Sequence, residues 1–375
     1  MNNVLGIVVL AEDESHIQEL TEARIMGAIP FAGRYRLIDF ILSNMVNSGL
    51  RSVAMLFGER SQSLLNHLSA SKSWDLNSRK GGLIYWPFKN EIAIRKAKGS
   101  FLACLREHLQ DLKDSPQEYI LISNSNCIIN LDFVKVFDFA EKKDADIILV
   151  YSKIDGKHAE ARVSALTLDL SKDNKVIGVT EHINRLVTGN IYSEIIYIKK
   201  NILIEVIEYS EENELASVAS LIRIISEGKY KTYGFKNTGY FAVIESLSCY
   251  YAESMKILGS EHFQEIFLSE DFPIFTKALN LAPALIKTGA IVNNSLISSG
   301  SRIEGVVEFS VLSRDVLVKK GAIVKDSIIL SDCIIEEDAE VIGAIIDKNS
   351  VVMAKEKIIK SDNETFTYYT SVNYK

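Results

Sequence analysis

Residues 291–352 read IVNNSLISSGSRIEGVVEFSVLSRDVLVKKGAIVKDSIILSDCIIEEDAEVIGAIIDKNSVV, and large apolar residues recur in this stretch six positions apart. They form three series: Ile291, Ile297, Ile303 and Phe309; then Val311, Leu317, Ile323, Ile329, Ile335 and Val341; then Ile346 and Val352. We interpret the breaks between the series as loop insertions. A period of six fits neither an α-helix nor a simple hairpin, and over this length it predicts a hexapeptide parallel β-helix.

The first 255 residues follow another pattern, in which apolar runs alternate with amphipathic segments. Runs typical of buried strands occupy residues 4–10, 52–57, 119–123 and 146–152, and residues 133–142 have helical spacing. This alternation predicts a doubly wound α/β sheet, in which ligands bind at the carboxyl ends of the strands. We expect an α/β domain over residues 1–255, a linker over 256–285 and the β-helix domain over 286–375.

The composition is that of a soluble two-domain protein of 375 residues, with 47% hydrophobic and 24% charged residues. A net charge of −7 without a basic stretch argues against a nucleic-acid partner. The N-terminal apolar run has no basic flank, and no run is long enough to span a bilayer, so we expect neither a signal peptide nor a membrane anchor. The four cysteines form no CxxC pair, which favours reduced thiols in a cytoplasmic protein: Cys104, Cys127, Cys249 and Cys333.

Residues 30–49, PFAGRYRLIDFILSNMVNSG, closely resemble the N-terminal block of ADP-glucose pyrophosphorylases (glucose-1-phosphate adenylyltransferases). Segments 63–75 and 343–348 (GAIIDK) resemble further motifs of that family. The resemblance implies a nucleotidyltransferase domain followed by a left-handed β-helix, over most of the chain. It also implies a phosphate-binding loop of the form LAGGxGxRLxxLTxxRAKP directly before residue 30.

That loop departs from the family pattern. A phosphate cradle needs glycines, whose backbone N–H groups approach the oxygens, and cationic side chains. Here Glu12 and Asp13 replace glycines, and Ile17 lies where the loop arginine is expected. Within the RAKP motif Arg24 remains, but the lysine becomes Met26. The sequence therefore predicts that the triphosphate-binding chemistry is lost.

Four further family positions also lack their charged residue. Nucleotidyl transfer joins two anions, so the family uses cations and Mg²⁺-binding carboxylates. The matching residues here are Leu102 for the aspartate of GTADA, Ser125 for the aspartate of GDHIY, His182 for the lysine of EKP and Val243 for the aspartate of DVGT. We expect that shifting the last alignment by a residue or two recovers no carboxylate. The concerted losses predict that this chain has no catalytic residues, no bound metal and no cofactor of its own.

This pattern resembles the non-catalytic GlgD-type subunits of the family, which assemble with a catalytic subunit for glycogen synthesis. The resemblance implies a regulatory or scaffolding subunit in a heterotetramer, whose catalytic partner uses Mg²⁺ and ATP. An alternative is a catalytically active sugar-1-phosphate nucleotidyltransferase with a rearranged site. A hexapeptide acyltransferase is disfavoured, because such enzymes use a β-helix histidine as base and no histidine follows His262.

Cationic residues near the expected ligand edge are candidates for binding an effector or a sugar phosphate: Arg24, Arg34, Arg36 and Lys98. For Arg34 and Arg36 a structural role competes with ligand binding, and Lys98 belongs to a basic patch that is more typical of a solvated face. Residues 12–14 form an acidic triplet, which we interpret as a solvated loop in preference to a metal site. Asp39 lies near a helix start, where a carboxylate stabilises the free N–H groups. The isolated His16, His67 and His182 are predicted to be structural.

Overall fold

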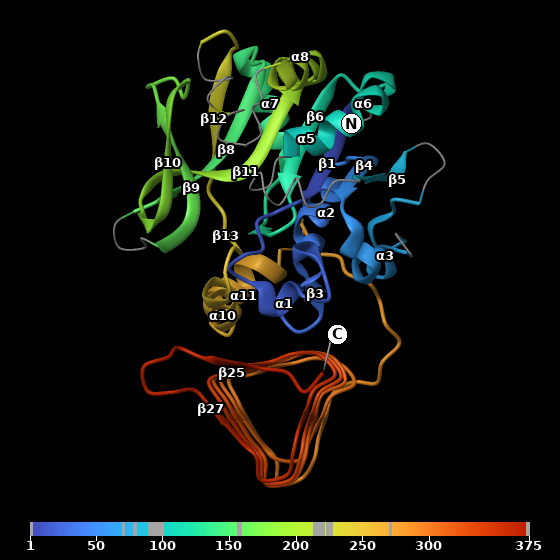
Figure 1. Cartoon of the computed structure of the whole chain (residues 1–375), viewed down its shortest axis with the longest axis vertical. Helices are drawn as coiled ribbons and strands as arrows, with labels where there is room; N and C mark the ends of the chain where they lie inside the picture. Colours follow the sequence, from blue (N-terminus) through green and yellow to red (C-terminus); the bar gives the residue numbers. More distant parts are fainter. Residues whose placement is uncertain are drawn as a thin grey trace.

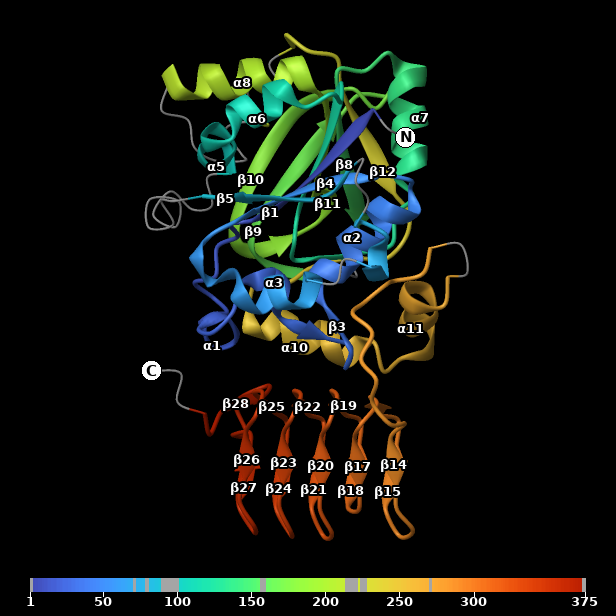
Figure 2. The same ribbon diagram turned by 90° about the vertical axis from the view of Figure 1, so that its right-hand side faces the viewer.

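The computed structural model describes residues 3–69, 72–77, 81–88, 101–155, 160–212, 222, 228–269 and 272–372. An α/β unit lies above a three-sided coil of short strands in Figure 1, and Figure 2 shows the coil from its side. None of the helices in these ranges is both long and apolar enough to cross a membrane.

A nine-stranded sheet forms the centre of the α/β unit. Its main path runs β10 (Val176–Val187), β9 (Glu160–Leu170), β11 (Gly189–Lys199), β6 (Tyr119–Asn124), β1 (Val4–Leu10), β4 (Ser52–Phe57) and β5 (Gly82–Pro87), and β8 (Ile147–Ile154) and β12 (Thr232–Asn237) pair beside β11. Strand β1 is parallel to β4 and β6, whereas β11 runs antiparallel to β6. The predicted α/β fold is confirmed, with a sheet that is mixed outside its parallel centre.

Alternate residues of β1 face two different hydrophobic layers. Leu5, Ile7 and Val9 pack with residues of α5 (Phe101–Glu107), α6 (Leu109–Asp114) and α8 (Lys200–Glu212). Val4, Val8 and Leu10 pack with residues of α2 (Leu37–Asn47), α3 (Gln62–Leu68) and α7 (Phe133–Lys143). Because both faces are covered, β1 is buried along its whole length, which explains its lack of polar alternation.

The C-terminal unit is a left-handed β-helix of three parallel five-stranded sheets. The first sheet contains β14 (Leu285–Ile286), β17 (Arg302–Ile303), β20 (Leu317–Val318), β23 (Ile334–Ile335) and β26 (Val351–Val352). The second contains β15 (Ile291–Asn293), β18 (Val306–Glu308), β21 (Ile323–Lys325), β24 (Glu340–Ile342) and β27 (Lys357–Ile359). The third contains β16 (Leu296–Ile297), β19 (Val311–Leu312), β22 (Ile328–Ile329), β25 (Ala344–Ile346) and β28 (Thr367–Tyr369).

The six-residue period of apolar residues predicts the β-helix correctly. It places some side chains inside the coil that in fact lie on its outer surface. Ile297, Ile303 and Ile329 point into the coil as expected, whereas Ile291 and Ile323 are exposed on its outside. The reason is coil length. Register pairs such as 291↔306 and 306↔323 show coils of 15 and 17 residues instead of 18. These coils therefore shift the phase at a corner without a long loop insertion. The last coil differs, because the register pair 344↔367 gives it 23 residues and thus an inserted loop.

A third hydrophobic cluster joins the two units. It combines the inner segments of the α/β unit with residues on the facing sheet of the β-helix, including Phe31, Phe40, Val311, Ile328 and Ile345. Helices α10 (Leu247–Lys256) and α11 (Ser260–Phe267) lie at this junction in Figure 1, so the segment 256–285 contains a helix. The Tyr251 hydroxyl donates to the Asp326 carbonyl oxygen at 2.6 Å, which also connects the two units.

Candidate functional site

The carboxyl ends of β1 and β6 lie side by side, and the acidic loop folds back onto them. The Glu12 carboxylate accepts hydrogen bonds from the Ser125 backbone N–H at 2.6 Å and from the Ser125 Oγ at 2.5 Å. Burial raises the pKa of Glu12 from its usual 4.5 to about 7, although the Ser125 hydrogen bonds oppose this shift. Glu12 thus occupies the edge of the sheet where a ligand phosphate is expected.

The other two members of the triplet behave differently from each other. Glu14 accepts a hydrogen bond from the Met26 backbone N–H at 3.0 Å and forms an ion pair with Arg60. Asp13 is exposed and accepts the Ser15 N–H at 3.0 Å. The prediction of a solvated acidic loop is therefore wrong for Glu12 and Glu14, because their carboxylates are partly buried and accept hydrogen bonds from within the fold.

A cavity of about 800 Å³ opens beside this loop. Its lining includes five carboxylates, Glu12, Asp13, Glu14, Glu19 and Glu22, together with Arg60 and His16. The lining of the cavity is thus predominantly acidic. In the part of the chain that the structure describes, no group of three or more histidine, cysteine or acidic side chains is arranged to hold a metal ion.

Four of the eight altered family positions lie in the hydrophobic core. The side chains of Ile17, Met26 and Leu102 are each 0% exposed, and Val243 is 5% exposed in β13 (Phe241–Val243). The neighbouring Gly27 also packs tightly, since a Cβ there would lie 2.8 Å from the Ser125 Oγ. Apolar packing therefore fills space where the family resemblance implies charged groups.

His182 in β10 is held by its own neighbours. Its Nε2 lies 2.8 Å from the Thr167 Oγ1, and Arg185 approaches its Nδ1 at 2.5 Å. Burial and the Arg185 charge lower the pKa of His182, which favours the neutral ring. A neutral imidazole with both nitrogens engaged does not supply the positive charge of the family's lysine.

The structure contains a second polar cluster at the same edge, which the sequence did not predict. Glu194 in β11 has a positive φ of 58° and accepts a hydrogen bond from the Asn124 Nδ2 at 3.1 Å. Burial raises the pKa of Glu194 to about 7, against the opposing effect of Arg162. Arg162 donates to Glu245 at 2.8 Å, and the same carboxylate accepts the Val163 N–H at 2.7 Å.

Glu245 contradicts the expectation that shifting the alignment at Val243 recovers no carboxylate. It lies two residues after Val243, so a shift of that alignment does recover a carboxylate. The carboxylate is engaged by Arg162, however, and its side chain is only 13% exposed. The carboxylate itself is visible in the sequence, but its contact with Arg162 is not, because only the fold brings β9 beside the segment that follows β13.

The three described cationic candidates, Arg24, Arg34 and Arg36, do not all line one cavity. Arg24 forms a bidentate ion pair with Asp347 of the β-helix, at 3.0 and 3.1 Å. Arg36 donates to the Ser63 carbonyl oxygen at 2.8 Å, and the Arg34 guanidinium lies 4.8 Å from the centre of the Tyr35 ring. Lys98 lies outside the described residues.

Arg34 and Arg36 instead line a cavity of about 190 Å³ at the junction of the two units, together with three cations that the sequence analysis did not select: Lys277, Arg314 and Lys348. Burial lowers the pKa of Arg36 to about 10, and Arg24 and Arg314 add repulsion. The pKa of Lys348 is lowered for the same reasons, by burial and then by Arg36 and Arg24. Asp315 and Asp332 also line this cavity, so its five cations outnumber two carboxylates. An excess of crowded, partly desolvated cations favours an anionic ligand.

Asp39 has the structural role that its position predicts. It is the third residue of α2, and its Oδ2 accepts the Arg36 N–H at 3.0 Å in a capping arrangement. Its Oδ1 lies 2.6 Å from the His67 Nε2, and both side chains are buried. His67 thereby supports the start of the helix that directly follows Arg34 and Arg36.

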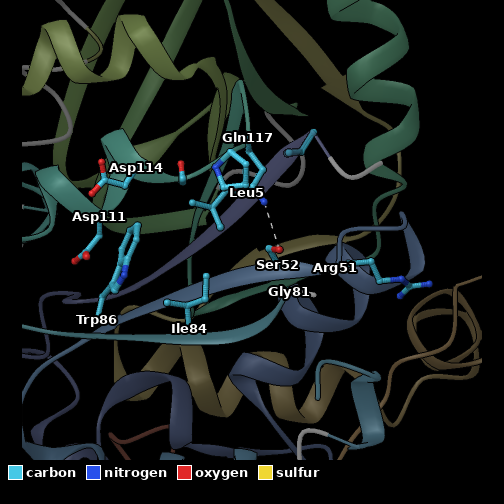
Figure 3. A pocket seen from close by; sticks show the side chains of 12 residues that line it. Leu5, Arg51, Ser52, Gly81, Ile84, Trp86, Asp111, Asp114 and Gln117 are labelled. Atoms are coloured by element: carbon cyan, nitrogen blue, oxygen red, sulfur yellow. Dashed lines mark hydrogen bonds between the residues drawn. The ribbon is translucent and has the colours of Figure 1, made fainter. Parts of the chain in front are cut away.

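A further cavity of about 630 Å³ lies at the opposite edge of the sheet (Figure 3). It is lined by Leu5, Ile84 and Trp86 as well as Asp111 and Asp114, and the Gln117 Nε2 donates to the Ser52 Oγ at 3.4 Å. Leu5 and Ser52 lie near the amino ends of β1 and β4. Ligands of doubly wound sheets bind at the carboxyl ends, so this cavity is not the counterpart of the nucleotide site.

Comparisons with known proteins agree with this architecture. The Nucleotidyl transferase family model matches residues 15–265, and the GlmU-like C-terminal hexapeptide model matches residues 284–371. The glycogen biosynthesis protein GlgD of Bacillus subtilis (strain 168) is 34% identical over 320 residues, covering 85% of this chain and 82% of that protein. GlgD of Geobacillus stearothermophilus is 30% identical, with the same coverage. The glucose-1-phosphate adenylyltransferase of Bacillus cytotoxicus (strain DSM 22905 / CIP 110041 / 391-98 / NVH 391-98) is 27% identical over 97% of this chain and 96% of its own length.

The fold and its ligand edge thus define a nucleotidyltransferase-type protein with a hexapeptide β-helix. More narrowly, the chain belongs to the glucose-1-phosphate adenylyltransferase family and is similar to its GlgD members.

Proposed function

We propose that this chain is a non-catalytic regulatory or scaffolding subunit for ADP-glucose synthesis in glycogen biosynthesis. It would assemble with a homologous catalytic subunit, as a heterotetramer, and raise or modulate the activity of that partner. The observation that carries the proposal is the Glu12–Ser125 contact, which places a carboxylate of this chain at the edge where the family binds phosphates. The GlgD names of similar proteins support the same pathway.

Electrostatics supports the non-catalytic part of the proposal. A triphosphate that entered the cavity beside the acidic loop would meet five carboxylates and the Arg60 guanidinium, which is already paired with Glu14. Glu245, the carboxylate nearest the altered DVGT position, is paired with Arg162. The residues present therefore do not fit a magnesium–nucleotide complex. Losing one electrostatic stabiliser typically lowers a rate on the order of a hundredfold, and several are absent here.

The junction between the units supports the regulatory part. Lys348 of the β-helix and Arg36 of the α/β unit line the same cavity, so an anion bound there would contact both units. An effector changes a partner's activity when it binds one arrangement of a protein better than another. We therefore assign the candidate effector role to Arg34 and Arg36 with Lys277, Arg314 and Lys348. Arg24 supports this role only indirectly, through its ion pair with Asp347.

Co-expression with the catalytic homologue of the same organism tests the proposal. We expect a complex that contains both chains and a specific activity, or an effector response, that differs from the catalytic subunit alone. A matched preparation carries a catalytic subunit with an inactivated site, so that any remaining activity must come from this chain. Absence of a complex together with unchanged activity would overturn the proposal. ADP-glucose formation by this chain alone, with Mg²⁺, would instead support an active enzyme with a rearranged site.

A further inference from the structure

The proposed function does not use the cavity at the amino ends of β1 and β4 (Figure 3). Residues of β1, β4, the edge strand β5, helix α6 and the segment 115–117 line this cavity. Its volume of about 630 Å³ lies within the range of roughly 300–1,000 Å³ that is typical of small-molecule sites. The chemistry of its walls therefore indicates which kind of molecule it fits.

One wall of the cavity is apolar and firmly held. It contains Leu5 of β1 together with Ile84 and Trp86 of β5, and Ile84 is 38% exposed. The Trp86 ring stacks on the His108 ring, with ring centres 5.3 Å apart and an angle of 6° between the planes. The His108 Nε2 donates to the Pro87 carbonyl oxygen at 3.0 Å, which fixes this stack. A fixed aromatic side chain beside an exposed isoleucine favours a ligand with an apolar body.

Two buried side chains of the cavity have a polar atom without a hydrogen-bond partner among the described residues. Trp86 is 5% exposed, and its Nε1–H donates to none of these residues. Gln117 is 7% exposed; its Nε2 makes a long contact of 3.4 Å with the Ser52 Oγ, and its Oε1 accepts no hydrogen bond from them. Neither atom is sealed inside the protein, so a bound molecule can reach both. Buried polar groups are normally hydrogen-bonded, so these two atoms favour a ligand that supplies an acceptor and a donor.

Charged side chains are distributed unevenly around the cavity. Asp111 and Asp114 of α6 lie together at one side in Figure 3, whereas the Arg51 side chain lies at the other side and points away. The Asp111 Oδ2 lies 2.9 Å from the His108 Nδ1. Asp114 accepts a hydrogen bond from the neutral Gln110 side chain at 2.9 Å and has no cationic partner among the described residues. The side of the cavity that α6 forms therefore favours a positively charged group.

We propose that this cavity binds a small organic cation, an amine whose apolar body packs on Ile84 and Trp86 and whose ammonium group faces Asp114. A hydroxyl or amide group on such a molecule accepts the Trp86 Nε1–H and donates to the Gln117 Oε1. Phosphates and carboxylates are disfavoured, because the carboxylates of α6 repel them. The cavity lies at the opposite edge of the sheet from the acidic loop, so this proposal does not rest on the proposed regulatory function.

Ligand-observed NMR titration of the purified full chain tests the proposal. The probes are phenethylamine and hexylamine, and phenylacetate and hexanoate serve as anions with similar apolar bodies. We expect both amines to bind and the matched anions to bind at least about tenfold more weakly, because the charge at the α6 side is negative. Phenethylamine should also change the tryptophan fluorescence, since Trp86 lines the cavity.

Substitutions at exposed positions locate the binding site. The double variant Asp111→Asn with Asp114→Asn should weaken amine binding about tenfold, because it removes both carboxylates from the cavity. Ile84→Lys places a like charge on the apolar wall and should abolish binding. The matched control is Asp173→Asn, which removes a carboxylate from the exposed turn between β9 and β10 and should bind the amines like the unmodified chain.

Circular dichroism verifies that each variant is folded, and the aspartate double variant decides the test if Ile84→Lys is not. The proposal is overturned if neither amine binds the unmodified chain, or if the anions bind as tightly as the amines. It is also overturned if the folded cavity variants retain the affinity of the unmodified chain, or if Asp173→Asn loses affinity equally. These substitutions leave the acidic loop and the cavity at the junction of the units unchanged, so complex formation with a catalytic subunit is a separate outcome.

Discussion

Arg24 and Asp347 form a buried, bidentate ion pair between residues 323 positions apart in the chain. The arginine lies in the segment that resembles the family's substrate loop, and the aspartate lies in the GAIIDK segment of the β-helix. Their side chains are 6% and 0% exposed. The arginine of the altered RAKP segment therefore joins the two units of this chain.

Asp347→Ala should strongly destabilise the protein. The substitution leaves the Arg24 guanidinium buried without its bidentate partner, and breaking a buried pair in this way typically costs about 3–5 kcal/mol. Chemical denaturation followed by circular dichroism measures the loss in the free energy of unfolding.

The double variant Arg24→Met with Asp347→Leu separates charge burial from packing. Replacing both partners by apolar residues of similar size removes the uncompensated charge, so most of the lost stability should return. A double variant as unstable as Asp347→Ala would show that packing around these residues dominates instead.

Glu12→Gln should make the stability less dependent on pH. The pKa of Glu12 is raised to about 7 in the folded chain, above its usual 4.5. Between these values the folded chain retains a proton that the unfolded chain releases, so the stability falls as the pH rises from 4.5 to 7 and then stays level. Glutamine can still accept the Ser125 hydrogen bonds, and we expect a gain of roughly 2–3 kcal/mol at pH 8 and little change at pH 5.

Denaturation at both pH values checks this expectation, with Glu19→Gln as the control. Glu19 lines the same acidic cavity but is exposed, so its substitution should leave the pH profile unchanged. Equal effects of the two substitutions would contradict the assigned burial of Glu12.

Phe309→Asn should stabilise the β-helix. Phe309 has a positive φ of 46° at a corner where the corresponding residues of other coils are Asn294, Asp326 and Gly343. Asparagine and glycine tolerate this conformation better than an aromatic residue, and Phe309 is 41% exposed, so little burial is lost. We expect a gain of about 0.5–1 kcal/mol in thermal unfolding. Phe309→Val, with a β-branched side chain at the same φ, should lower the stability.

Inorganic phosphate should stabilise the protein through the cavity at the junction of the units. A ligand that binds only the folded state adds stability that grows with its concentration, about 2.7 kcal/mol at a hundredfold excess over its Kd. Lys348→Ala removes one cation of the cavity and should abolish most of this gain in a thermal-shift series against chloride at equal ionic strength. Lys320→Ala, at an exposed position of the same β-helix, should respond like the unmodified chain. Identical responses of the two variants would contradict an anion site at Lys348.

Both domain folds follow from local patterns in the sequence. The uninterrupted apolar run of β1 reflects a strand with two buried faces, and the six-residue period reflects a coil with three flat sides. The position of Asp39 at a helix start also follows from the sequence alone. The phase of the coils does not, because coils of 15, 17 and 23 residues depart from the expected 18. As a result, Phe309 moves from the expected interior to an exposed corner.

The contacts of the ligand edge could not be read in the same way, because they join residues that are distant in the chain. Sequence comparison identifies Glu12 and Ser125 as altered positions, but only the pairing of β1 with β6 brings the carboxylate onto the serine. Likewise, Glu194 and Glu245 become site residues only when the antiparallel strands bring them near Arg162. Local sequence thus determined the two folds and the loss of charged family residues. Burial and long-range strand pairing decided which partners the remaining charged side chains have and how their pKa values shift. The physical reason is that the energy of a charge depends on its surroundings in three dimensions.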